Sequence, residues 1–431
     1  MSTPRYIESE RLLKNALKTI PLGSQTFSKS TTQYPFGVSP YFASKAEGSY
    51  LWDVDGNKYI DFINSLAAIN LGYGDPDVNA AVHRQVDEGT IFSLSHTLEI
   101  EVAEKMVEMI PCAEMVRFGK NGSDATAGAI RIARAYTGRD YVAVCGYHGW
   151  QDWYIGSTAR NLGVPEVTKE LTKPFKYNDL SSLETLFKEY PGKIAGVILE
   201  PMNIFYPEDG FLEGVKELAH KNGALLVFDE TVTGFRFANG GAQELFNVTP
   251  DLATFGKGLA NGYPLSAVVG KREYMKLMEE VFFSFTFGGE TLSLAAALAS
   301  MNKLQTHDVI KKVYSLGEEL VKGVRALISK HKVEHIFNIH GNPTWTFLMV
   351  KDVDSYTQWE LKTLFLQEIF SRGILSLGTH NLSYAHSSED IKQLVGVYNE
   401  VFPLIRDAIK ERSVKDVLRC NPLEPLFKVR Q

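Results

Sequence analysis

Residues 225–270 read LLVFDETVTGFRFANGGAQELFNVTPDLATFGKGLANGYPLSAVVG, and this stretch decides the fold. Three short apolar runs stand in it, at residues 225–228, 252–255 and 265–269. Each run is too short for a helix and is bounded by Gly, Pro, Asn or Asp, so the pattern predicts three buried strands. The first run leads into Asp229 and Glu230, and the second leads into Lys257 between two glycines.

A carboxylate and an amine at the ends of neighbouring strands face one crevice, because ligands of open α/β sheets gather at the carboxyl ends of parallel strands. A lysine holds an aldehyde cofactor as a Schiff base, and an aspartate keeps the pyridine nitrogen of that cofactor protonated. Asp229 and Lys257 therefore indicate pyridoxal 5'-phosphate (PLP), and Gly256 and Gly258 leave room for a ring beside the backbone. The alternative is that Asp229 begins a turn and Lys257 is a solvated surface lysine.

The composition limits the classes of protein to which the chain can belong. The chain has 431 residues, of which 44% are hydrophobic and 22% charged, as in an ordinary globular protein long enough for two domains. A net charge of -6 gives no electrostatic reason to expect nucleic acid or an anionic membrane as a partner. No signal peptide is recognisable at the N-terminus. Cys112, Cys145 and Cys420 lack metal-ligand spacing, so we expect no metal and a cytoplasmic location.

The order of predicted elements gives an α/β fold with three segments. Residues 1–62 are expected to hold a helix over residues 7–19, a Ser/Thr-rich loop on the substrate side and a hairpin around Asp55-Gly56, as part of a small domain. Residues 63–305 alternate helices with short strands and predict a large PLP-binding domain, a mostly parallel sheet sandwiched by helices. Residues 306–431 predict the C-terminal part of the smaller α+β domain.

Two further stretches carry candidate cofactor contacts. Asn121-Gly122-Ser123 is a turn before a helix, with Ser123 as the expected N-cap, and the free N–H groups of such a helix start bind phosphate. Tyr147 and His148 follow a predicted strand, where an aromatic side chain can stack on a planar cofactor. A plain capped helix and ordinary core packing are the alternatives for these two stretches.

Two polar loops complete the candidate set. Glu200 and Asn203 follow the strand AGVILE and can hydrogen-bond to substituents of a cofactor or simply cap that strand. Thr286 lies in the loop FSFTFGGETL before a predicted helix and is a second candidate phosphate ligand.

In this order the pieces resemble the class III (subgroup II) PLP-dependent aminotransferases of fold type I, most strongly the glutamate-1-semialdehyde 2,1-aminomutase type. The resemblance runs from about residue 48 to residue 391. It is carried by the strand that ends at Glu200 and by GSYLWDVDGNKYIDF (48–62), GSDAT (122–126), AIRIARAYTGRD (129–140), YHG (147–149), GALLVFDETVTGFR (223–236), GGAQ (240–243), TPDLATFGKGLANGYP (249–264) and TFGGET (286–291).

The resemblance implies a role for each candidate residue. Lys257 forms the internal aldimine and shuttles the proton, and Asp229 pairs with the pyridine nitrogen. The other cofactor-binding positions implied are Gly122 and Ser123 at the phosphate, Thr286 from the second subunit of a homodimer, Tyr147 on one ring face with His148 beside it, Glu200 and Asn203 at the ring edge, and Thr231 on the opposite face, where the family usually has valine.

The departures from the family concern the substrate. Lys29 stands where the aminomutase has an arginine for the substrate carboxylate, and lysine cannot reproduce the two-pronged geometry of arginine. Phe27 and Tyr34 add aromatic rings to the same loop. A pocket of rings and hydroxyls suits a larger, sugar-like substrate as well as an amino acid.

We therefore expect the protein to transfer an amino group from an amino acid donor to an aldehyde or ketone acceptor. Glutamate is the first choice of donor. The alternatives are an aminomutase, which is an isomerase that uses one molecule as donor and acceptor, and a decarboxylase or racemase on the same scaffold. A non-catalytic relative would have lost Lys257 or Asp229, and both residues are present.

Overall fold

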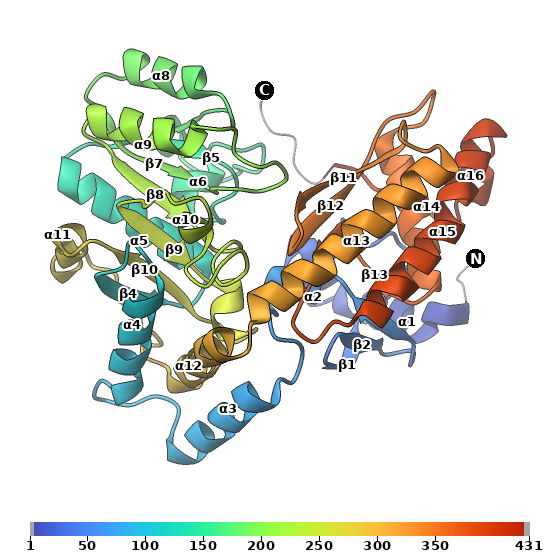
Figure 1. Cartoon of the computed structure of the whole chain (residues 1–431), viewed down its shortest axis with the longest axis horizontal. Coiled ribbons are helices and arrows are strands. Elements are labelled where there is room, and N and C mark those ends of the chain that lie inside the picture. Colours follow the sequence, from blue (N-terminus) through green and yellow to red (C-terminus); the bar gives the residue numbers. More distant parts are fainter. Residues whose placement is uncertain (1–3, 426–431) are drawn as a thin grey trace. The chain divides into compact units, whose positions relative to one another are not determined.

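The computed structural model describes residues 4–425, which form two compact units (Figure 1). The larger unit consists of residues 67–70 and 75–310, and the smaller unit consists of residues 4–66, 71–74 and 311–425. The smaller unit is thus built from both ends of the chain. None of the helices within residues 4–425 is long and apolar enough to cross a membrane.

A seven-stranded sheet forms the centre of the larger unit. Its strand order is β4-β10-β9-β8-β7-β5-β6, and β10 alone runs antiparallel to its neighbours β4 and β9. The mostly parallel sheet predicted from the sequence is confirmed. The strands are β4 (Met115–Gly119), β5 (Tyr141–Cys145), β6 (Thr172–Pro174), β7 (Ile194–Leu199), β8 (Leu225–Asp229), β9 (Leu252–Phe255) and β10 (Ser266–Gly270).

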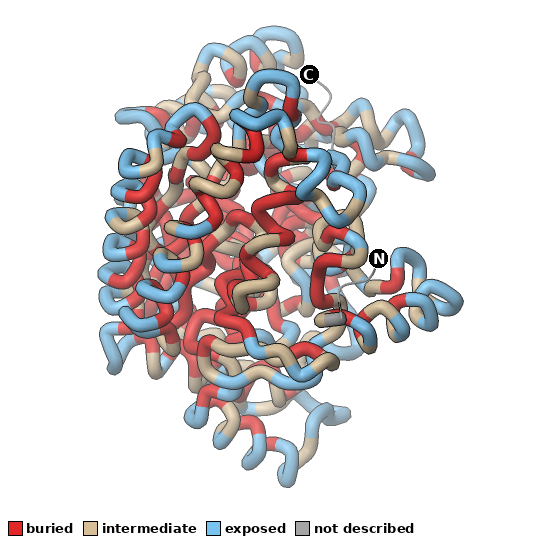
Figure 2. Tube along the Cα trace, turned by 90° about the vertical axis from the view of Figure 1, so that its right-hand side faces the viewer, coloured by how far each residue is buried: buried red, intermediate tan, exposed pale blue. Residues whose placement is uncertain are grey.

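Both faces of this sheet are buried, and Figure 2 marks the buried residues along the chain in red. Ile198 and Val227 point to the face covered by α5, whereas their chain neighbours Val197 and Leu226 point to the opposite face and are also fully buried. Buried parallel strands read as continuous apolar runs for this reason. The helices of this unit are α3 (Pro76–Glu88), α4 (Thr97–Met109), α5 (Gly122–Thr137), α6 (Asp152–Ile155), α7 (Glu166–Glu170), α8 (Leu180–Glu189), α9 (Phe211–Lys221), α10 (Ala242–Leu245), α11 (Arg272–Met275) and α12 (Thr291–Thr306), with 3-10 turns η4 (Lys257–Ala260) and η5 (Lys276–Glu279).

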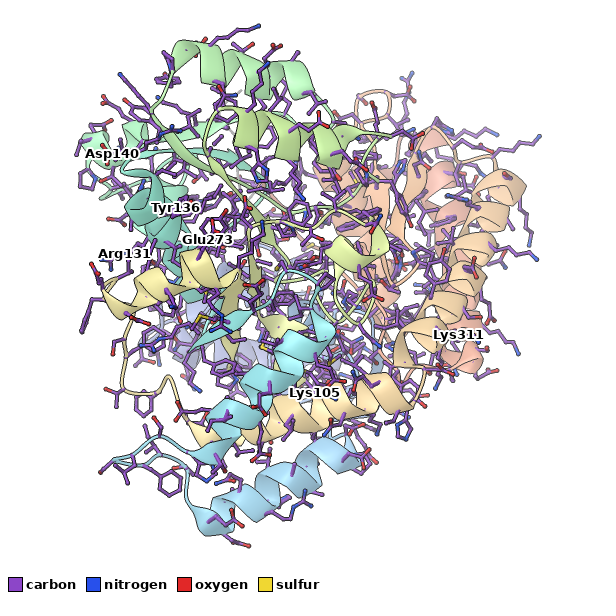
Figure 3. All side chains as sticks on the ribbon, turned by 60° about the vertical axis from the view of Figure 1, so that its left-hand side comes forward. Lys105, Arg131, Tyr136, Asp140, Glu273 and Lys311 are labelled. Carbon is purple, nitrogen blue, oxygen red and sulfur yellow. The ribbon has the colours of Figure 1, made fainter. Side chains whose placement is uncertain are left out.

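Helix α5 is the central helix of the larger unit. Asn121 is its N-cap, and Asp124 reaches back to the N–H of Asn121 at 2.7 Å. The expectation that Ser123 caps this helix is therefore wrong: Asn121 has the extended backbone that a cap needs, and Ser123 already lies inside the first turn. Near the other end of α5, Tyr136 donates a hydrogen bond to Glu273 of α11 at 3.3 Å (Figure 3).

Two small sheets and several helices make up the smaller unit. The sheets have the strand orders β1-β2-β3-β13 and β11-β12-β14. The strands are β1 (Ala43–Glu47), β2 (Tyr50–Asp53), β3 (Lys58–Asp61), β11 (Phe337–Asn342), β12 (Trp345–Val350), β13 (Ile374–Leu375) and β14 (Thr379–Asn381). The helices are α1 (Ile7–Ala16), α2 (Asn64–Ala67), α13 (Val309–His331), α14 (Gln358–Ser371), α15 (Ser388–Lys410) and α16 (Val414–Val417), with 3-10 turns η1 (Pro4–Tyr6), η2 (Pro21–Gly23) and η3 (Phe27–Lys29).

The N-terminal predictions are correct in type and differ in one boundary. The hairpin is present as β2 and β3, which pair antiparallel around Asp55 and Gly56, and Gly56 has φ 84°. The first helix ends at Ala16 and not at residue 19. Residues 17–19 continue as a tighter turn, in which the N–H of Thr19 bonds to the carbonyl of Ala16 at 3.0 Å.

A run of four residues after β3 has an unusual backbone. Residues 64–67 all have positive φ, between 45° and 66°, and none of them is glycine. Asp61 anchors the start of this run, because its carboxylate accepts hydrogen bonds from the N–H groups of Ile63 at 2.7 Å and Asn64 at 3.0 Å. Left-handed non-glycine residues are strained and often mark functional segments.

Candidate active site

Asp229 closes β8 and lies fully inside the larger unit. One carboxylate oxygen, Oδ1, accepts hydrogen bonds from the N–H of Thr231 at 3.1 Å, its hydroxyl at 2.5 Å and the hydroxyl of Thr254 at 3.2 Å. The other oxygen, Oδ2, lies 2.8 Å from Nδ1 of His148. Burial raises the pKa of Asp229, but the hydrogen bonds from His148 and Thr231 outweigh burial and hold this pKa below its ordinary value.

Lys257 begins the 3-10 turn that follows β9. Its φ is 43°, a left-handed value that residues other than glycine rarely adopt. The amine forms no hydrogen bond to any residue of the described part of the chain. Burial lowers the pKa of this amine, while the negative charges of Glu200 and Asp229 raise it, and the net effect is a lowered pKa. Burial in this place therefore favours the neutral form of the amine.

Glu200 follows β7 directly and faces the same space. Its Oε2 accepts hydrogen bonds from the N–H of Tyr147 at 3.0 Å and from Nδ2 of Asn203 at 2.9 Å. A Cβ atom on Gly146 would lie 2.5 Å from this oxygen, so Gly146 allows Glu200 its position. Burial raises the pKa of Glu200, and the charge of Asp229 adds to this effect.

The start of α5 supplies donors of the kind that bind phosphate. The N–H groups of Gly122 and Ser123 have no hydrogen-bond partner among the described residues, as is usual for the first turn of a helix. Thr231 packs against Gly122, where an added Cβ would lie 3.0 Å from its methyl carbon. Gly149, with φ 105°, approaches Ser123 so closely that an added Cβ would lie 2.5 Å from Ser123 Oγ.

The structure thus brings nine of the ten predicted cofactor residues into one connected region of the larger unit: Gly122, Ser123, Tyr147, His148, Glu200, Asn203, Asp229, Thr231 and Lys257. Thr286 differs from these nine. It is exposed, in the loop between η5 and α12.

The three predicted substrate residues belong to the smaller unit. Lys29 and Tyr34 line a cavity of about 400 Å³ there, together with Asp61, Ser65 and Tyr73 among others. Phe27 does not line this cavity, and its side chain is exposed.

Sequence reasoning missed two residues that shape the site. Thr254 is a polar residue in the apolar strand β9, and the register of β8 and β9 places it opposite Asp229. Gly149 follows His148 and makes room for Ser123. Two signals in the sequence could have identified them: a threonine within an apolar strand, and a glycine directly after two residues with ring side chains.

The residues present fit pyridoxal phosphate. A carboxylate has about four lone-pair positions, and Asp229 Oδ2 uses one of its own for His148, so one remains for a pyridine N–H. The two free N–H groups and the hydroxyl of Ser123 at the start of α5 suit the phosphate, and the neutral amine of Lys257 suits the aldehyde. Fold and site together define a PLP-dependent enzyme.

Comparison with known proteins gives the family. The family model described as Aminotransferase class-III matches residues 33–387, and the chain belongs to this family. Among curated proteins, the chain is 35% identical over 406 residues to 3-aminobutyryl-CoA aminotransferase of Cloacimonas acidaminovorans, covering 92% of this chain and 97% of the relative. It is 34% identical over 433 residues to glutamate-1-semialdehyde 2,1-aminomutase of Aquifex aeolicus, covering 94% of this chain and 100% of the relative.

Solved structures agree with this assignment. The FumI protein of Sphingopyxis sp. MTA144, in its PLP internal aldimine form, has a TM-score of 0.87 and 26% identity, with 93% of this chain and 97% of that protein covered. An omega-transaminase from Sphaerobacter thermophilus has a TM-score of 0.84 and 26% identity, with 94% and 100% covered. The resemblance to class III aminotransferases, the fold and the cofactor expected from the sequence are confirmed.

Proposed function

We propose that this aminotransferase uses glutamate as amino donor and an aldehyde or ketone as acceptor, with Lys257 and Asp229 as its catalytic residues. The observation that carries the proposal is the pair itself: an unbonded amine of lowered pKa and an ionised buried carboxylate, at the ends of adjacent parallel strands. The pyridoxal phosphate, when bound, supplies an aldehyde that accepts amines and a protonated ring that withdraws electrons.

Lys257 is the acid and base of the reaction. Its Nζ, when neutral, would take a proton from Cα of the donor and would deliver a proton to the carbonyl carbon of the acceptor, so the same atom would serve both halves of the transfer. The lowered pKa supports this role, because an ordinary lysine is protonated at neutral pH and cannot accept a proton.

The other residues orient the cofactor. With the cofactor bound, Asp229 would hold the ring nitrogen and His148 would keep the carboxylate in place, while Gly122 and Ser123 would hold the phosphate. We assign Tyr147 to one ring face and the methyl group of Thr231 to the other. Glu200 and Asn203, which are bonded to each other, belong at the ring edge.

Lys29, Phe27 and Tyr34 are proposed as substrate-contacting residues. The cavity that Lys29 and Tyr34 line supports an acceptor with several hydroxyls, because its wall combines an ammonium group with phenol and serine hydroxyls and the carboxylate of Asp61. A sugar-like acceptor fits this description as well as one derived from an amino acid.

We further propose that the enzyme works as a homodimer, in which Thr286 completes the phosphate site of the second copy. Support comes from the loop around Thr286, where Phe282 and Phe287 are 79% and 56% exposed. Exposed rings of this kind mark a surface for a partner. A mixture of Lys257→Ala and Thr286→Ala chains tests the arrangement: hybrid dimers should regain activity that neither variant has alone, and no gain on mixing would contradict it.

The donor is tested by the visible absorption of the loaded enzyme. Glutamate should bleach the band of the bound cofactor and release one equivalent of 2-oxoglutarate per site in the absence of any acceptor. D-glutamate serves as the control and should leave the band unchanged. A band that persists with glutamate, with no 2-oxoglutarate formed, would reject glutamate as the donor.

An aminomutase is the second candidate, because the aminomutase of Aquifex aeolicus is matched over its whole length. An aminomutase would isomerise glutamate-1-semialdehyde with no separate acceptor and would release no 2-oxoglutarate from glutamate. Incubation with each compound, followed by product analysis, therefore separates the two functions. We also propose a cytoplasmic location, supported by three unpaired cysteines.

A further inference from the structure

Three left-handed segments of the larger unit meet at the side chain of Asn70. They contain Ala67 with φ 66°, Phe235 with φ 58°, and the turn from Lys257 with φ 43° to Asn261 with φ 45°. Such values are rare for residues other than glycine, and they persist only where the surroundings hold them. Asn70 is 5% exposed and is bonded to Phe235, Arg236 and Asn261, and Arg236 in turn is bonded to Ala67.

The bonds of Asn70 reach the turn that carries the lysine. Its backbone N–H donates to Asn261 Oδ1 at 3.0 Å, and its Nδ2 donates to the carbonyl of Phe235 at 2.9 Å. Its carboxamide also lies directly on Gly258, where an added Cβ would be 2.1 Å from Nδ2. Asn70 therefore fixes the turn from Lys257 to Asn261 at two points. Its side chain packs on Gly258, and its backbone N–H bonds to Asn261.

Arg236 is a further hydrogen-bond partner of the Asn70 side chain. Its Nη2 donates to Asn70 Oδ1 and, at 3.4 Å, to the carbonyl of Ala67. The guanidinium group is 2% exposed, and burial lowers its pKa to about 10, so it remains charged at neutral pH. A buried cation thus sits one carboxamide away from the backbone next to Lys257.

The charges that act on the Lys257 amine come from three places. Glu200 at the end of β7 and Asp229 at the end of β8 favour its charged form, and Arg236 in the loop after β8 favours its neutral form. Without Arg236, the two carboxylates would face the amine with burial as the only opposing influence.

We propose that Asn70 and Arg236 are positioning residues for Lys257: Asn70 holds the left-handed turn that carries the lysine, and Arg236 supplies a fixed positive charge that favours the neutral amine. The inference rests on the proposed role of Lys257. It separates two tasks, geometry and charge, between two bonded residues, so each task has its own test.

The charge is tested in the cofactor-free protein, where Lys257 carries no group. Competitive acetylation over pH 6–11, read for each lysine by mass spectrometry, gives the titration midpoint of the Lys257 amine. Arg236→Gln should move the midpoint upward and slow labelling at pH 8 by roughly threefold or more, because a nearby cation is lost. Arg236→Lys keeps the charge and should restore the midpoint. An unchanged midpoint in a folded Arg236→Gln protein would overturn the charge assignment.

The matched control is Arg139→Gln. Arg139 is half-buried and, like Arg236, donates to backbone carbonyls, here those of Ile194 and Asn222, but it is not among the charges that shift the pKa of Lys257. This variant should leave the midpoint where it is. Should Arg236→Gln fail to fold, Arg236→Lys decides the matter alone: a midpoint that moves although the charge is kept would overturn the proposal, and a retained midpoint would support it.

The geometric task is tested by hydrogen exchange of Asn70→Ala. Amides of the turn from residue 258 to residue 261 should exchange at least roughly tenfold faster, while those of β8 and β9 stay protected. A uniform rise across the larger unit would mean that Asn70 is merely structural, and no rise at the turn would remove it from the proposal. Neither experiment depends on which donor the enzyme uses, so failure here and failure of the glutamate assignment are distinguishable.

Discussion

At the scale of single residues, one hydroxyl group distinguishes this candidate site from the pattern that the family resemblance implies. Thr231 stands where the family usually has valine, and in the structure it does two things. Its methyl group packs against Gly122 and Gly256, as a valine would, and its hydroxyl donates to Asp229. The threonine therefore helps to keep the carboxylate ionised.

This arrangement predicts the effect of two substitutions. Thr231→Val removes the hydroxyl and keeps the methyl, so the pKa of Asp229 should rise and kcat should fall roughly tenfold, as expected when a hydrogen bond to a charged group is lost. Thr231→Ser keeps the hydroxyl and should retain most of kcat. Steady-state kinetics over pH 5–8 measures both, and equal losses in the two variants would contradict this explanation.

Lys257→Ala should separate binding from turnover. Without the amine, kcat should fall by at least about 10³-fold, because general acid–base catalysis is lost. The cofactor should still bind through Asp229, Gly122 and Ser123, although no longer covalently. Borohydride reduction of the loaded proteins, followed by gel filtration in denaturant, checks this, since reduction fixes the cofactor to Lys257 of the wild type as a secondary amine and the variant has no such bond. Full activity in the variant would reject the whole assignment.

At the scale of elements, what the sequence could predict depended on local signals. The apolar runs before Asp229 and Lys257 predicted both strands, because buried strands are short, continuous and closed by turn residues. The predicted N-cap of α5 was wrong because serine and asparagine are both good caps. The spacing of Asn121 and Asp124, which form a capping box, was the better signal. The role of Asn70 could not be predicted, since it depends on three left-handed turns that only the folded chain brings together.

The sheet β11-β12-β14 of the smaller unit contains a pH-sensitive element. His380 in β14 is fully buried, with Nδ1 2.9 Å from the Thr346 hydroxyl and Nε2 2.8 Å from that of Tyr398. Burial lowers the pKa of His380 to about 3. The unfolded chain takes up this proton near pH 6.5, so stability is complete above that pH and declines as the pH falls towards 3.

This linkage predicts a loss of about 2 kcal/mol at pH 5 from His380. His380→Gln should lower the free energy of unfolding at pH 7 and flatten its decline between pH 7 and pH 5. Urea unfolding at a series of pH values measures both effects. His335→Gln, at an exposed position of the same unit, is the control and should leave the slope unchanged. A slope that survives in His380→Gln would assign the acid sensitivity to other groups.

At the scale of the whole molecule, the proposed homodimer gives a role to the exposed rings near Thr286. The loop that carries them is bound to the segment before α4, because the N–H of Thr291 donates to the carbonyl of Thr90 at 3.0 Å. That segment exposes Phe92 and Leu94, the latter to 83%. Both segments thus expose apolar side chains.

Phe287→Asp should therefore weaken dimerisation and, with it, phosphate binding. Sedimentation velocity at micromolar concentration is expected to show mostly monomer, and the Kd for the cofactor should rise by tenfold or more, roughly the effect of losing a charge-assisted bond. Val417→Asp changes an exposed apolar residue of α16 and serves as the control. A dimer that persists in Phe287→Asp, with unchanged cofactor affinity, would contradict the shared site.

The construction of the smaller unit from both chain ends has a consequence during synthesis. Strand β3 pairs with β13 through Ile60 and Ile374, so its partner leaves the ribosome about 300 residues after it. At roughly 5–20 residues per second, this wait lasts about 15–60 s. The cofactor-binding unit, which ends at residue 310, is complete well before then. A nascent chain therefore passes through a stage in which the cofactor-binding unit is joined to an unpaired strand edge, a feature that favours pairing with other chains until β13 has emerged.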